Sequence, residues 1–129
     1  MICADTSVFI DFFKGSQTPC VEKFTIFLVQ KQLLMNPFVL SELLSSPKLP
    51  KKAEVHLLSI PKLTIMVDFF ERAGYLRRKI YQSGQGISMV DIYIAQICID
   101  HEISLLTLDR DFFLISRHSN LKVINVSLS

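Results

Sequence analysis

Short runs of apolar residues alternate with longer helical patterns along this chain, and this alternation constrains its fold more than any other feature. The runs that predict β-strands lie at residues 1–4, 33–35, 63–67, 103–107 and 122–126. Helical periodicity and helix-start signals predict helices at 7–13, 19–32, 37–45, 51–59, 68–82 and 88–102, and a short helical turn at 109–116. Strands separated by helices indicate an α/β fold with a parallel sheet.

Length and composition narrow the class of protein further. The chain has 129 residues, which is the size of one domain spanning 1–129, and no segment has the character of a linker. Half of the residues are hydrophobic, which suggests that a partner covers some apolar surface. No apolar run is long enough to cross a bilayer, and the first residues lack the basic leader of a signal peptide. We therefore expect a cytoplasmic protein.

The three cysteines do not indicate a metal site or a disulfide framework. Cys3, Cys20 and Cys98 form an odd set without a C-x-x-C spacing, and each lies in an apolar stretch. Free buried thiols are the usual interpretation of that pattern. We expect neither a disulfide nor a zinc site.

Four acidic residues fall where the predicted strands and helices meet. Asp5 follows the first strand, and Asp109 follows the fourth strand closely, after Thr107. Glu42 lies in the second turn of the helix after the second strand, and Asp91 lies in the first turn of an otherwise apolar helix. Because ligands of open parallel sheets bind at the carboxyl ends of the strands, we expect these four acids to gather at one edge of the sheet.

Carboxylates that are held close together repel one another, and a divalent cation with oxygen ligands relieves that repulsion. An all-carboxylate set favours Mg²⁺ or Mn²⁺ over zinc, which prefers His and Cys. Such an ion can activate water against a phosphodiester. If the site uses four of the 12 acidic residues, 14 basic residues face eight acidic ones elsewhere, a balance that suits an anionic substrate.

A purely structural interpretation of the same acids remains open at this stage. Asp5 and Asp109 are both suited to capping a helix N-terminus, and Ser88 with Asp91 fits a capping box. Glu42 then becomes an ordinary surface residue. In that interpretation the four acids need not meet.

Four motifs, in this order, resemble those of PIN-domain proteins. The segment 5–11 resembles the family's opening D-[TS]-[SN] and hydrophobic helix, and 41–44 resembles its second acidic motif. The segments 86–95 and 106–112 resemble the third and fourth motifs. The resemblance covers the whole chain, and its size most resembles the VapC-type toxins of bacterial and archaeal toxin–antitoxin pairs.

The resemblance implies a fold, an activity and partners. The fold would be a PIN-like three-layer α/β/α arrangement around a parallel sheet of about five strands. The activity would be an endoribonuclease that uses Mg²⁺ or Mn²⁺, with catalytic residues Asp5, Glu42, Asp91 and Asp109, of which Asp5, Asp91 and Asp109 bind the metal. A VapC-type protein would also form a homodimer and be inhibited by a small VapB-type antitoxin.

The fourth motif departs from the common pattern T-x-[ND]-x-x-D-F. Here Thr107, Asp109 and Asp111 follow one another as T-x-D-x-D-F, so either aspartate can be the one that faces the metal. We assign Asp109 as the ligand and Asp111 as an auxiliary ligand or a hydrogen-bond acceptor. Thr6, Ser7 and Thr107 carry hydroxyl groups that either support the carboxylates or cap helices.

Basic residues offer contacts for RNA. The segment 75–81 places Arg77, Arg78 and Lys79 between two tyrosines, a combination that can pair with phosphates and stack on bases. A solvated helix face is the alternative interpretation. Arg110, between the acids of the fourth motif, is a further candidate for a phosphate contact.

Other functions fit the sequence less well. A housekeeping RNA-processing nuclease of the same fold is the nearest alternative, and a non-catalytic binding protein would be expected to lack one of the four acids. A receiver domain needs paired acids after its first strand and a lysine at the end of its fifth. An aspartyl phosphatase needs D-x-D where this chain has Asp5, Thr6 and Ser7.

Overall fold

The computed structural model describes residues 1–124 and residue 126. Its helices and strands alternate as the sequence indicates, and helix α4 has the predicted bounds. In chain order they are β1 (Ile2–Ala4), α1 (Thr6–Phe13), α2 (Pro19–Val29), α3 (Pro37–Leu44), α4 (Lys51–Ser59), α5 (Phe69–Gln82), α6 (Met89–Asp100), β2 (Ser104–Leu106), α7 (Arg110–Arg117) and β3 (Val123–Ile124). No helix among these residues is long and apolar enough to span a membrane.

The sheet is parallel and has the order β1-β2-β3. Ala4 pairs with Leu106, and Leu105 pairs with Val123. Single parallel bridges extend the pairing beyond β1, from Ile2 to Leu33 and then from Met35 to Lys62. The prediction of about five strands therefore corresponds to three strands and two bridged segments in the described part of the chain. Asn125, within the predicted strand 122–126, lies outside the described residues.

The predicted strand at 63–67 is wrong. Only Lys62, just before it, forms a bridge, and the amide of Leu63 donates to the Met35 carbonyl at 2.9 Å. The carbonyls of Thr64 and Val67 instead bond to the side chains of His101 and Arg72, and Val67 is 82% exposed. The alternation of apolar residues here therefore does not reflect a buried strand.

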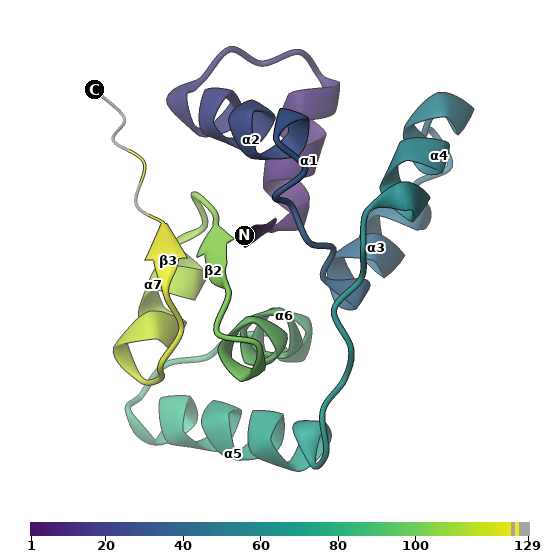
Figure 1. Ribbon diagram of the computed structural model, residues 1–129. Helices are drawn as coiled ribbons and strands as arrows, with labels where there is room; N and C mark the ends of the chain where they lie inside the picture. Colours follow the sequence, from purple (N-terminus) through teal and green to yellow (C-terminus); the bar gives the residue numbers. More distant parts are fainter. Residues whose placement is uncertain (125, 127–129) are drawn as a thin grey trace.

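Figure 1 shows the strands in the middle of the molecule, with α1 and α2 on one side and α6, with α5 beyond it, on the other. Helix α6 packs against β2 and also contacts α3, α5 and α7. The predicted burial of this helix is confirmed, because Ile92, Ile94 and Ile97 have almost no exposed surface. Each such side chain contributes roughly 1.5–3 kcal/mol through the hydrophobic effect. The elements packed around α6 hold this helix in place, and its first turn carries Asp91.

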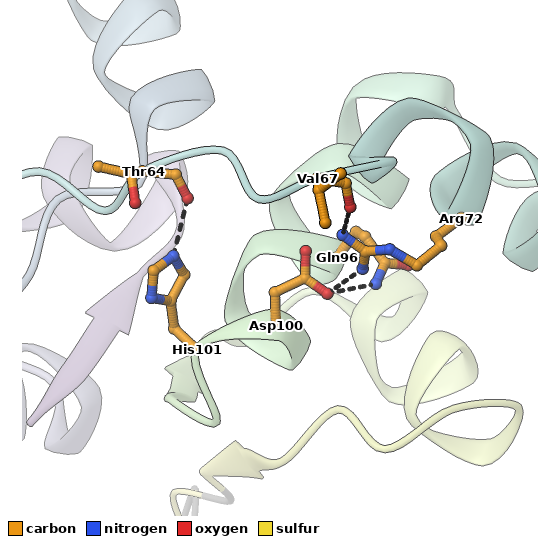
Figure 2. Close-up of polar contacts among 6 residues, drawn as sticks. All are labelled: Thr64, Val67, Arg72, Gln96, Asp100 and His101. Atoms are coloured by element: carbon orange, nitrogen blue, oxygen red, sulfur yellow. Dashed lines mark hydrogen bonds and ion pairs between the residues drawn. The ribbon is translucent and has the colours of Figure 1, made fainter.

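A polar network holds the segment between Lys62 and α5 against the end of α6. Figure 2 shows the Asp100 carboxylate facing Arg72 and Gln96, with Gln96 donating to it at 3.0 Å. The Asp100 side chain is only 7% exposed, so the Arg72 guanidinium supplies the charge that offsets its burial. Arg72 also donates to the Val67 carbonyl at 2.8 Å, and the network therefore fixes the entry to α5.

Candidate metal centre

Asp5 lies where β1 ends and α1 begins. One carboxylate oxygen, Oδ1, accepts hydrogen bonds from the Val8 amide at 3.1 Å and the Ser7 hydroxyl at 2.8 Å, so Asp5 caps the helix. The other oxygen accepts a hydrogen bond from the Thr107 hydroxyl. The residue is 3% exposed, and its burial raises the pKa of the carboxyl, whereas the bonds from Thr107, Ser7 and Val8 lower it.

Thr107 connects the ends of the two central strands. This buried residue follows β2, donates to Asp5 and accepts a hydrogen bond from the Asp109 amide at 2.9 Å. The negative charge of Asp109 in turn contributes to the raised pKa of Asp5. The first and fourth motifs therefore meet at one edge of the sheet through a single hydroxyl group.

Asp91, Asp109 and Asp111 form the tightest acidic group in the described part of the chain. Each offers a carboxylate oxygen, and these three atoms lie within 4.8 Å of one another. Asp109 and Asp111 stand at the N-terminus of α7, where Asp109 accepts a hydrogen bond from the Asp111 amide at 2.9 Å. Asp91 stands in the first turn of α6, which Ser88 caps. The packing of α6 against α7 brings the group together.

Glu42 belongs to the same neighbourhood. It lies on α3, is exposed, and accepts a hydrogen bond from the Thr6 hydroxyl at 2.7 Å. Its negative charge contributes to the raised pKa of Asp91. Helix α3 packs against both α1 and α6, which explains how a residue from the second motif reaches this site.

Burial and the neighbouring negative charges both disfavour the ionised form of Asp91. Its pKa is raised to about 6: burial raises it most, the charges of Asp109, Asp111 and Glu42 also raise it, and a hydrogen bond with Ser88 lowers it. Helix N-termini favour negative charge and offset part of this cost. The donor set consists of carboxylate oxygens, which are the ligands that Mg²⁺ and Mn²⁺ prefer. The residues present therefore fit a divalent metal ion.

The structure brings only some of the predicted site residues into the tight acidic group. Asp91 and Asp109 are in the tight group, whereas Asp5 stands outside it and lies beside Asp109. Asp111, which we assigned as an auxiliary ligand or a hydrogen-bond acceptor beside Asp109, joins the same group. Capping explains the positions of Asp5 and Asp109, but it does not explain why Asp91 and Asp111 converge with Asp109. The spacing T-x-D-x-D was the signal for one part of that convergence, because it puts Asp109 and Asp111 at one helix start.

The predicted basic residues have different surroundings. Arg77 donates to the Ile87 carbonyl at 2.8 Å, and Lys79 donates to the His118 carbonyl at 3.0 Å. Arg78 is exposed on α5, and its guanidinium lies over the ring of Tyr75. Arg110 is exposed at the first position of α7, between the two acids of the fourth motif.

Comparison with known proteins identifies the family. The PIN domain family matches residues 2–117, which is most of the chain, and the chain belongs to that family. The predicted PIN-like α/β fold is thereby confirmed. No curated protein sequence gives a significant match.

Solved structures share the fold at low sequence identity. A chain of VapBC2 from Rickettsia felis, crystallised with a DNA fragment from its promoter, has a TM-score of 0.72 and 22% identity, covering 98% of this chain and 100% of that one. FitAcB from Neisseria gonorrhoeae gives 0.70 and 19%, covering 97% of both chains. VapBC-5 from Mycobacterium tuberculosis gives 0.65 and 20%, covering 97% of this chain and 98% of that one.

The raised pKa of Asp91 predicts how stability depends on pH without metal. The folded pKa of about 6 exceeds the ordinary value of 3.8, so between these values the folded state binds more protons than the unfolded state. The contribution of Asp91 to stability therefore falls as the pH rises through this window. We expect Asp91→Asn to melt at a higher temperature than the wild type at about pH 8 in EDTA, and the difference to shrink below about pH 5.

Thermal melts across this pH range are the measurement, and Asp68→Asn is the matched control. Asp68 also stands at a helix start, but its side chain makes no capping bond and its φ of 58° suits asparagine. The control should show no such pH-dependent gain. A wild type as stable as Asp91→Asn at pH 8 would contradict the repulsion described here.

Proposed function

We propose that this protein is a metal-dependent endoribonuclease and the toxin of a type II toxin–antitoxin pair, acting in the cytoplasm. The observation that carries the nuclease proposal is the convergence of Asp91, Asp109 and Asp111 from two helix starts, with Glu42 and Asp5 beside them. Membership of the PIN domain family supports phosphodiester hydrolysis as the chemistry.

In this proposal Asp5, Asp91, Asp109 and Asp111 hold Mg²⁺ or Mn²⁺, directly or through water. When bound, such an ion lowers the pKa of water and neutralises charge on a phosphodiester. Thr107 fixes the Asp5 carboxylate, and Ser88 and the start of α6 position Asp91. The hydrogen bonds that one Asp5 oxygen accepts at the α1 start hold this carboxylate in a fixed orientation for binding the ion.

Glu42 has a separate role in the proposed mechanism. The Thr6 hydroxyl donates to its Oε1 atom at 2.7 Å and so orients the carboxylate, which remains exposed to solvent. We assign Glu42 as the acceptor of the proton that water releases as its oxygen bonds to phosphorus; the bond from phosphorus to the ribose oxygen breaks, and that oxygen takes a proton from solvent. The mechanism needs no covalent intermediate with the enzyme.

The nuclease proposal predicts metal-dependent cleavage of RNA. Purified protein should cleave bacterial total RNA with Mg²⁺ or Mn²⁺, and EDTA should abolish the cleavage. Asp91→Asn should reduce the rate roughly 100-fold or more, because it removes a charge from the metal site, whereas Asp68→Asn should leave the rate unchanged. Cleavage is read from the ends and sizes of the products. Equal cleavage in EDTA, or by Asp91→Asn, would contradict the proposal.

An apolar groove supports the antitoxin half of the proposal. A groove of about 830 Å³ runs between α1, α2 and α4 and is lined by apolar side chains that include Phe12, Phe13, Leu28 and Ile60. Its dimensions and lining suit an apolar peptide segment. The solved structures with this fold include members of toxin–antitoxin complexes. We propose that the C-terminal segment of a small VapB-type antitoxin occupies the groove.

We also propose a homodimer, because apolar side chains remain exposed away from the groove. Val67 is 82% exposed and Phe70 is 53% exposed, at the start of α5. A second copy of the chain would remove this surface from water. A monomeric mass in sedimentation analysis would contradict this part of the proposal.

Toxicity and its rescue test the groove. Expression of the wild type should arrest bacterial growth, Asp91→Asn should not, and co-expression of a small protein encoded beside this gene should restore growth. Ala53→Arg places a long side chain from α4 into the groove, and arginine is a good helix former. This variant should remain toxic and cleave RNA but resist rescue. Normal rescue of Ala53→Arg would place the antitoxin elsewhere, and Lys52→Arg is the matched control.

A further inference from the structure

One face of α5 carries a basic and aromatic stripe that the proposed catalytic site does not use. The stripe consists of Gly74 and the residues three, four, seven and eight positions after it, which are Arg77, Arg78, Tyr81 and Gln82. Residues at these spacings share one side of a helix. Together with Met89, the first residue of α6, they line a hollow of about 410 Å³. We call it the α5 hollow.

The cations of the α5 hollow are arranged around tyrosine rings. The Arg77 guanidinium lies 4.7 Å from the Tyr81 ring centroid and donates to the Tyr81 hydroxyl at 2.8 Å. Its bond to the Ile87 carbonyl fixes it against the loop that enters α6. Tyr81 is 52% exposed, so a large aromatic surface stands in water beside a fixed positive charge. Such a pairing suits an aromatic base attached to an anionic backbone.

Gly74 has no side chain that would fill the α5 hollow. It lies inside α5, where glycine weakens a helix relative to alanine. A Cβ atom at this position would have no described atom within 4 Å, so packing within the described chain does not require glycine. The consequence is space between the arginines and Met89.

We propose that the α5 hollow binds one nucleotide of single-stranded RNA, with the base stacked on Tyr81 and a phosphate paired with Arg78. Arg78 is exposed, with its guanidinium 5.2 Å from the Tyr75 ring centroid. Met89, which lines the hollow, and Asp91 both stand in the first turn of α6, so the hollow and the acidic site lie at the same end of that helix. Lys79, which bonds to the His118 carbonyl, does not line it. This inference rests on the proposed function, because it names a contact for the same substrate.

Binding of a short fluorescein-labelled oligouridine, measured by fluorescence anisotropy in EDTA at low salt, tests the hollow without cleavage. Tyr81→Leu should weaken binding roughly 5- to 100-fold, while Tyr81→Phe, which keeps the ring, should bind within about twofold of the wild type. Arg78→Gln should make the negative slope of log affinity against log salt shallower by about 0.7. Lys52→Gln, which removes an exposed charge on α4, is the control and should leave affinity nearly unchanged.

Gly74→Glu separates a loss of binding from a loss of folding. A glutamate four residues before Arg78 pairs with it along the helix and replaces a poor helix former, so the melting temperature should not fall. The same change fills the hollow with negative charge, and binding should weaken at least tenfold. Retention of wild-type affinity by Gly74→Glu and Tyr81→Leu would overturn the inference, as would a wild type that does not bind the oligonucleotide.

The outcomes distinguish this inference from the nuclease proposal. Oligonucleotide binding in EDTA does not depend on the metal site, so loss of binding in the α5 variants supports the hollow even if RNA cleavage fails. Metal-dependent cleavage with unchanged binding by the α5 variants supports the nuclease and overturns the hollow.

Discussion

The register between β1 and β2 is the constraint on which the candidate site depends. Because Ala4 pairs with Leu106 in parallel, the next residues along each strand, Asp5 and Thr107, emerge at the same edge and form a buried hydrogen bond. A slip of one residue would exchange the faces of the strand and break that contact. The Thr107 hydroxyl also accepts a local hydrogen bond from the amide of Asp109, so the start of α7 is fixed relative to the start of α1.

Helix N-termini then determine how much negative charge can gather at the carboxyl ends of the strands. Asp5, Asp91 and Asp109 each lie at or near a helix N-terminus, where free amide groups and the helix dipole favour a carboxylate. These interactions offset only part of the cost of burial and of repulsion, since the pKa of Asp91 remains raised to about 6. Because α6 is buried, Asp91 cannot move away from the other acids. The chain therefore holds several negative charges close together, and a divalent cation would relieve their repulsion.

The sequence predicted most of the helices because their start signals are local. Thr18 and Asn36 cap α2 and α3 just before the predicted segments, and Ser88, the first residue of the predicted segment 88–102, caps α6. The segment 63–67 was predicted wrongly because its partners are distant in the chain: Arg72 and His101 bond its carbonyls and keep it out of the sheet. The order of the acidic motifs pointed to one site, but the close approach of Asp91 to Asp111 depends on the packing of α6 against α7, which no local pattern encodes.

The proposed site for a divalent cation consists of Asp91, Asp109 and Asp111. Crystals soaked in Mn²⁺ and measured near the manganese absorption edge test this most directly. We expect an anomalous difference peak among the three carboxylates, and no peak there in crystals of Asp91→Asn. A peak only elsewhere on the protein, or none at a manganese concentration that supports RNA cleavage, would contradict it.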